Sequence, residues 1–229
     1  EEFEIVGDGD GNHHPQYKHT TNQLVKGLNY RKVVSELNHF NQHHKYYYLN
    51  FNFKTEACLR IAKVLEKFDL LWLEIDMYQP ESIKQIKEST TTRICTGENL
   101  FYMREYLPYF QMHSADMFMI DVPWNGFSQS KKVGDLAEVY QHNVAPHNYY
   151  SHLSSFISAS LCAVLPNVRI MEIDIDDVPW KDRLTNNQPK IEDGFMEIPT
   201  LPGWGADIDE EVARAHQWDQ SKLGYMDFS

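Results

Sequence analysis

The chain has 229 residues and a formal charge of −12 at pH 7, with 42% hydrophobic and 24% charged residues. These values fit one globular domain, and the acidic charge argues against general affinity for nucleic acid or an anionic membrane, so a small-molecule partner is expected. No apolar stretch approaches the roughly 20 residues that span a bilayer, and the acidic start is unlike a secretory signal, so we expect a cytoplasmic location.

The first 45 residues have an irregular pattern. Residues 3–6 are a candidate strand, a loop rich in Gly, Asp and His follows, and residues 22–40 carry apolar side chains at helical spacing. The sequence therefore predicts one strand and one helix in residues 1–45, ahead of a more regular region.

Residues 46–190 alternate short apolar runs with amphipathic segments. The runs, which are typical of buried parallel strands, are 46–50, 70–73, 93–97, 117–120, 144–146 and 168–171. The helices expected between them are 55–68, 81–89, 99–110, 128–142 and 153–165. The third of these helices should end or bend near Pro108. This alternation predicts a parallel α/β sheet or barrel.

Five of the strand ends carry a residue able to bind a metal or move a proton. They are Glu74, Glu98, Asp121, His147 and Glu172, and their residue numbers differ by 24, 23, 26 and 25. Because the carboxyl ends of parallel strands converge on one mouth of a barrel, these side chains predict an active site there. For any one of them alone, a simpler role as a helix cap or surface ion pair is the competing interpretation.

The stretches around these residues carry a family resemblance. They are 68–74 (FDLLWLE), 95–98 (CTGE), 119–121 (MID), 144–148 (VAPHN), 167–172 (NVRIME) and the later segment 192–205. Together they resemble the barrel domain of the mandelate racemase and muconate lactonizing enzymes of the enolase superfamily. The resemblance implies a partial TIM-type (β/α) barrel that lacks the family's N-terminal capping domain, with residues 191–229 as its closing segment.

The resemblance also implies metal-assisted removal of the proton α to a carboxylate, through an enediolate. Mg²⁺, with Mn²⁺ as the alternative, would be held by Glu74 and Glu98, with Asn50 as the third ligand. The reaction implied is that of a sugar acid dehydratase or a racemase, acting on a hydroxy acid or sugar acid. We also expect a homo-oligomer.

The remaining roles follow from the same resemblance. Asp121 would orient His147 as general base or acid, and Glu172 would face the substrate carboxylate. Lys18 is the candidate for the family's catalytic lysine. For substrate binding the candidates are Trp124, Asn125 and His152, which lie just after the strand ends.

Two departures from the family leave alternatives open. Tyr48 stands where the family has its first metal-binding aspartate, and a protonated phenol is a poor Mg²⁺ ligand. At most seven strands are expected, against the eight of a closed barrel. The chain is therefore also interpreted as a truncated or diverged non-catalytic homologue, or as a subunit that completes its barrel with a partner chain.

Overall fold

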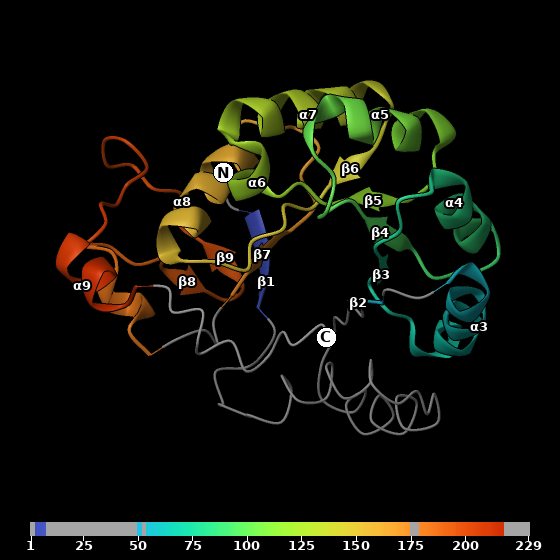
Figure 1. Ribbon diagram of the computed structural model, residues 1–229, viewed down its shortest axis with the longest axis horizontal. Coiled ribbons are helices and arrows are strands. Elements are labelled where there is room, and N and C mark those ends of the chain that lie inside the picture. The colour runs from blue at the N-terminus through green and yellow to red at the C-terminus, as the bar shows by residue number, and fades with distance from the viewer. Residues whose placement is uncertain (1–2, 8–49, 52–53, 175–178, 218–229) are drawn as a thin grey trace.

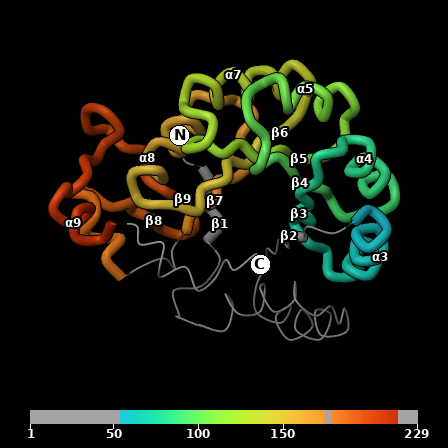
Figure 2. Tube along the Cα trace, viewed as in Figure 1, coloured from blue at the N-terminus to red at the C-terminus, as the bar shows by residue number. Residues whose placement is uncertain are grey.

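The computed structural model describes residues 3–7, 50–51, 54–174 and 179–217. These residues form a mixed α/β structure in which a curved row of strands is lined on its outer side by helices (Figure 1). The chain winds from α3 to α8 with each helix on the convex side of the arc (Figure 2).

The longer sheet is parallel and has the strand order β2-β3-β4-β5-β6. Its members are β2 (Asn50–Phe51), β3 (Leu73–Ile75), β4 (Ile94–Thr96), β5 (Met117–Phe118) and β6 (Asn143–Val144). A second sheet has the order β7-β1-β9-β8, with β7 (Met171–Ile173), β1 (Phe3–Gly7), β9 (Phe195–Met196) and β8 (Ile191–Glu192). In it β1 runs parallel to β7 and antiparallel to β9.

Backbone contacts between residues 144–146 and 168–172 join the two sheets into one row. Val144 forms a parallel bridge with Val168, and the amide of Glu172 donates to the carbonyl of Pro146 at 3.1 Å. The order of strands from β2 to β7 therefore follows the chain. Such a wall, with helices outside it, is the arrangement that brings the carboxyl ends of consecutive strands together.

The helices form where amphipathic segments cover the strands. They are α3 (Thr55–Leu65), α4 (Pro80–Glu88), α5 (Tyr102–Met112), α6 (Val122–Asn125), α7 (Phe127–Val139), α8 (His152–Cys162) and α9 (Glu210–Ala215), with 3₁₀ turns η1 (Glu66–Phe68) and η2 (Lys181–Arg183). In α3 the buried residues are Cys58, Ala62 and Leu65, at the spacing of one helix face.

Alternation along the strands separates two apolar layers. Leu73 and Ile75 pack in the main core between sheet and helices. Trp72 belongs instead to a cluster on the other face, which also contains Met119 and Ala145. Because successive strand residues point to opposite faces, residues 74, 121 and 147 follow this inner cluster up to the strand ends. The fold thus gathers the predicted polar residues on one face.

Most predicted elements occur close to their expected positions. The helix expected at 99–110 begins later, at Tyr102, and continues through Pro108 to Met112 rather than ending at the proline. The hairpin of β8 and β9 was not predicted. Its turn residues, Asp193 and Gly194, have φ values of 51° and 83°, which suit an Asp-Gly two-residue turn. The predicted helix at 22–40 lies outside the described residues.

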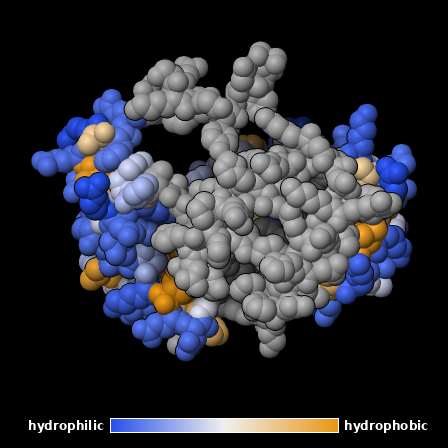
Figure 3. Space-filling model, turned by 90° about the horizontal axis from the view of Figure 1, so that it is seen from below, coloured by the Kyte–Doolittle hydropathy of each residue, from blue (hydrophilic) through white to orange (hydrophobic). Residues whose placement is uncertain are grey.

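The surface is polar with isolated apolar side chains. The coloured parts of the face in Figure 3 are mainly hydrophilic, with separate hydrophobic spots. Within the described ranges, no helix combines the length and the apolar character needed to cross a membrane.

Candidate active site

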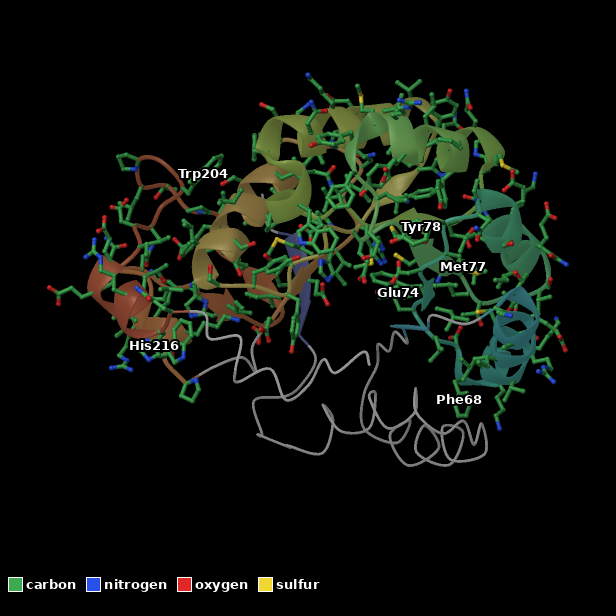
Figure 4. The ribbon with its side chains drawn as sticks, viewed as in Figure 1. Phe68, Glu74, Met77, Tyr78, Trp204 and His216 are labelled. Atoms are coloured by element: carbon green, nitrogen blue, oxygen red, sulfur yellow. The ribbon has the colours of Figure 1, made fainter. Side chains whose placement is uncertain are left out.

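Glu74 is a buried carboxylate in the middle of β3. Its exposed fraction is 2%, and Trp72 Nε1 donates a hydrogen bond to its Oε2 at 3.4 Å. Figure 4 shows Glu74 on the concave side of the strand row, close to where Met77 and Tyr78 follow β3. An anion in such a place is costly unless a proton or a cation compensates its charge.

Glu98 and Asp76 lie beside Glu74. Ligand oxygens of the three carboxylates all lie within 4.8 Å of one another. Burial, together with the charges of Glu172 and Asp76, raises the pKa of Glu74 to about 8. Burial and the charges of Asp76 and Glu74 raise the pKa of Glu98 to about 9. Three hard oxygen donors with this excess of negative charge fit a divalent cation such as Mg²⁺.

His147 pairs with Asp121 at the ends of neighbouring strands. A parallel bridge joins the two residues, and Nδ1 of His147 lies 2.7 Å from Oδ2 of Asp121. The carboxylate is 1% exposed, so the pair is well shielded from water. This hydrogen bond fixes the ring orientation and leaves Nε2 to face the site.

Nε2 of His147, the nitrogen not bonded to Asp121, faces two other carboxylates. Nε2 lies 3.5 Å from Oε2 of Glu98 and 3.5 Å from Oε2 of Glu172. Burial on its own would lower the pKa of His147. The hydrogen bond to Asp121, followed by the charges of Glu172 and Glu98, raises the pKa of this imidazole to about 9. Without a bound cation the ring therefore carries both protons at pH 7.

Asp121 has two structural roles, one through each oxygen. Oδ1 accepts from the backbone amide of Trp124 at 2.8 Å and caps α6. Oδ2 faces His147 and also accepts from the hydroxyl of Tyr150 at 2.6 Å. Asp121 thus caps α6 and contacts His147, and its role in catalysis stays a prediction.

Glu172 is held by the loop that follows His147. The amide of Asn148 donates to its Oε2 at 3.0 Å. Asn148 is itself fully buried, where its amide nitrogen donates to Ser155 Oγ at 3.0 Å and its amide oxygen accepts from Ser154 Oγ at 2.7 Å. These contacts anchor the loop to α8 and fix the position of Glu172.

The structure places the three predicted substrate-binding residues in different surroundings. Trp124 is 47% exposed and stacks on Phe101 with ring centroids 5.3 Å apart. Asn125 is buried, and its amide bonds to backbone groups of Leu100, Tyr102 and Asp121. His152 Nε2 lies 2.7 Å from Asp182 Oδ1. Asn125 therefore holds loops together, and substrate contact by any of the three stays a prediction.

Two predicted residues lie at or beyond the limit of the described structure. Asn50 belongs to β2, where the register pairs it with Glu74 of β3. Its role as a ligand stays a prediction. Lys18 and Tyr48 lie outside the described residues, so the lysine assignment also stays a prediction.

Asp76, Tyr150 and Asn148 were missed by the sequence reasoning. The signal for Asp76 was present, because Glu74-Ile75-Asp76 places two carboxylates on one strand face. Tyr150 and Asn148 gave no such signal, since their partners lie 29 and 24 residues away in the chain.

Comparison with known proteins agrees with this arrangement. Residues 49–212 match the family described as Enolase C-terminal domain-like. The chain belongs to this family. The predicted resemblance and the α/β fold of enolase-superfamily type are thereby confirmed.

Members of this superfamily with named activities are similar to the chain. It is 32% identical over 178 residues to the D-xylonate dehydratase of Haloferax volcanii, covering 76% of this chain and 43% of that protein. It is 27% identical over 175 residues to the D-gluconate dehydratase of Thermoproteus tenax, covering 75% of this chain and 35% of that protein. The chain thus spans less than half the length of these curated relatives.

A solved member of the superfamily contains a metal ion. It is a Burkholderia xenovorans protein provisionally named L-alanine-DL-glutamate epimerase, bound to magnesium and fumarate. The TM-score is 0.72 at 42% identity, covering 74% of this chain and 43% of that one. A fold of this type therefore accommodates Mg²⁺ together with a carboxylic acid.

Proposed function

We propose that this chain provides the active site of a Mg²⁺-dependent sugar acid dehydratase. The observation that carries the proposal is the convergence of two groups of side chains. Three carboxylates, Glu74, Asp76 and Glu98, lie within 4.8 Å of one another, and Nε2 of the Asp121–His147 pair lies 3.5 Å from Glu98. A cation site beside a proton-transfer group suits removal of a proton α to a carboxylate.

The donor set suits the metal ion. Glu74 and Glu98 would hold it, because both present carboxylate oxygens and both have pKa values raised by burial next to further negative charge. Bound there, Mg²⁺ or Mn²⁺ supplies an electrophile that stabilises the negative charge developing on the substrate carboxylate.

The protein side chains would handle the protons. His147 exchanges a proton with the substrate through Nε2, and Asp121 holds the ring in position through Nδ1. Glu172, fixed by the amide of Asn148, would bind the substrate carboxyl group. In dehydration, Nε2 of His147 would take the proton from the α carbon and deliver it to the hydroxyl group of the neighbouring carbon, which leaves as water. The enol that remains becomes a 2-keto acid.

Dehydration fits the described residues better than racemisation does. Racemisation needs a proton-transfer group on each face of the substrate, and the dyad supplies one. The similarity to the D-xylonate and D-gluconate dehydratases points the same way. The similarity to the protein provisionally named an epimerase makes racemisation the second candidate.

The test combines turnover with metal binding. The chain is incubated with D-xylonate or D-gluconate and Mg²⁺, and formation of 2-keto acid and exchange of the α proton with D₂O are followed by NMR. His147→Asn should lower turnover roughly 10²–10⁴-fold while Mg²⁺ still raises the melting temperature. Glu98→Gln should abolish the Mg²⁺-dependent rise.

A matched control is available at a second histidine. His113 ends α5 with φ 50°, a conformation that asparagine tolerates, so His113→Asn should keep activity. The proposal fails if the unmodified chain, folded by circular dichroism, shows neither a Mg²⁺-dependent rise in melting temperature nor proton exchange with these acids.

A further inference from the structure

The carboxylate of Asp76 shares a face with Glu74. Leu73 and Ile75, which alternate with them along the chain, are at most 1% exposed and pack in the main core. Asp76 follows directly after the end of β3, so alternation carries it to the concave side where Glu74 lies. The sequence Glu74-Ile75-Asp76 thus delivers two carboxylates from one strand.

The three carboxylates have a separation that one cation can bridge. Oxygens on opposite sides of a Mg²⁺ ion are about 4 Å apart, because each bond is about 2.1 Å long. Ligand oxygens of Glu74, Asp76 and Glu98 already lie within 4.8 Å of one another. Small side-chain rotations would therefore be enough to enclose an ion.

Asp76 lies three residues before the N-cap position of α4. Helix α4 begins at Pro80, and its N-cap is Gln79. Asp76 lines a small cleft together with Tyr78, Thr96 and Gly97.

We propose that Asp76 is a third carboxylate ligand of the divalent cation, alongside Glu74 and Glu98. This inference rests on the proposed function, because it assigns a ligand to the same metal site. Asp76 supplies a carboxylate directly after β3. The family's first metal-binding aspartate is replaced by Tyr48 in this sequence. The three carboxylates then come from two adjacent strands, β3 and β4, and from the residues that follow them.

The test measures Mn²⁺ binding directly, without substrate. Free and bound Mn²⁺ are quantified by electron paramagnetic resonance for the unmodified chain, Asp76→Asn and Asp76→Ala. Because carboxylate charge sets affinity for hard cations, both variants should bind Mn²⁺ on the order of tenfold or more weakly than the unmodified chain. The matched control is Asp135→Asn on α7, where the carboxylate pairs with Lys131, and its affinity should be unchanged.

Each outcome separates this inference from the proposed function. Binding is measured at a temperature at which near-ultraviolet circular dichroism shows every variant to be folded, so lost affinity is not lost structure. If the unmodified chain binds Mn²⁺ and both Asp76 variants bind it within twofold, the Asp76 assignment is overturned while the proposed function stands. If the unmodified chain does not bind Mn²⁺, both proposals are overturned.

Discussion

The hydroxyl of Tyr150 donates to Oδ2 of Asp121, at 2.6 Å. The same oxygen lies 2.7 Å from Nδ1 of His147. Oδ2 of Asp121 therefore accepts hydrogen bonds from both an imidazole and a phenol. Both hydrogen bonds stabilise the buried carboxylate. Because they share one acceptor oxygen, the strength of each affects the strength of the other.

Removing the Tyr150 hydroxyl should make His147 more basic. In Tyr150→Phe, Oδ2 of Asp121 loses one donor, so its charge acts more fully on the imidazole and raises the pKa of His147 further. We also expect a loss of about 1–2 kcal/mol in the free energy of unfolding. An NMR titration of the His147 ring in EDTA measures the pKa. The control is Tyr149→Phe, at the exposed neighbouring tyrosine. An unchanged or lower pKa in Tyr150→Phe would contradict the prediction.

In EDTA, the protein should lose stability as pH rises from about 4.5 to about 9. The pKa of Glu74 is raised to about 8 and that of Glu98 to about 9, from ordinary values of 4.5. The folded state therefore binds more protons than the unfolded state between these limits. The stabilisation is complete below pH 4.5 and is lost as pH rises through 8 to 9. His147, with its pKa raised to about 9 from 6.5, acts in the same direction above pH 6.5.

Thermal melts in EDTA and in Mg²⁺ between pH 5 and pH 9 check this expectation. Each raised group contributes up to roughly 1.4 kcal/mol per pH unit within its own window. Mg²⁺ should make the melting temperature depend less on pH, because a cation stabilises the ionised carboxylates. In EDTA, Glu74→Gln should also reduce this pH dependence, because the substituted side chain does not titrate. A melting temperature in EDTA that rises with pH would contradict the assignment of these raised pKa values.

The sequence pattern predicted the candidate site better than it predicted the individual contacts. Regular spacing placed Glu74, Glu98 and His147 on one face, because the period of the strand-helix unit is set by the lengths of its elements. Asp76 was missed because the predicted strand ends at Leu73, whereas β3 extends to Ile75. The partner of Tyr150 could not be read from spacing, because that contact depends on how the loop after β6 folds back.

Asn125 illustrates a second limit of sequence reasoning. A polar residue shortly after a strand end suggests substrate contact, yet its amide binds the backbone of the loop at Leu100 and Tyr102. Only tertiary packing decides whether a polar side chain faces substrate or satisfies buried backbone groups.

Gly97 should be required for the conformation that precedes Glu98. Its φ is +117°, and a Cβ atom there would lie 2.9 Å from the carbonyl oxygen of Met119. Gly97→Ala must shift backbone next to Glu98, so we expect both destabilisation and weaker Mn²⁺ binding. Gly126 is the matched control, because its φ is +73° and a Cβ there meets nothing within 4 Å.

Urea unfolding separates the cost of a side chain at positive φ from the cost of the contact with Met119. Gly126→Ala should lose about 1–3 kcal/mol, because its φ of 73° and ψ of 151° are essentially restricted to glycine. Gly97→Ala should lose roughly a further 1–3 kcal/mol, as overpacked sites do. Equal losses in the two variants would show that the contact with Met119 does not constrain the position.

Removing Lys181 alone from its buried ion pair with Asp174 should cost more stability than removing both charges. Their side chains are 6% and 0% exposed, and Nζ lies 3.2 Å from Oδ2. Lys181→Met leaves a buried carboxylate without its cation, which should cost roughly 3–5 kcal/mol of unfolding free energy. Replacing Asp174 by asparagine in the same chain removes that charge and should recover most of the loss.

A surface pair shows what burial contributes. Lys131 and Asp135 pair on α7 with side chains 35% and 49% exposed, so Lys131→Met should cost less than about 1 kcal/mol. Urea unfolding of the single and double variants gives the coupling energy of the buried pair. A loss in Lys181→Met no larger than that in Lys131→Met would mean that water or another group compensates Asp174.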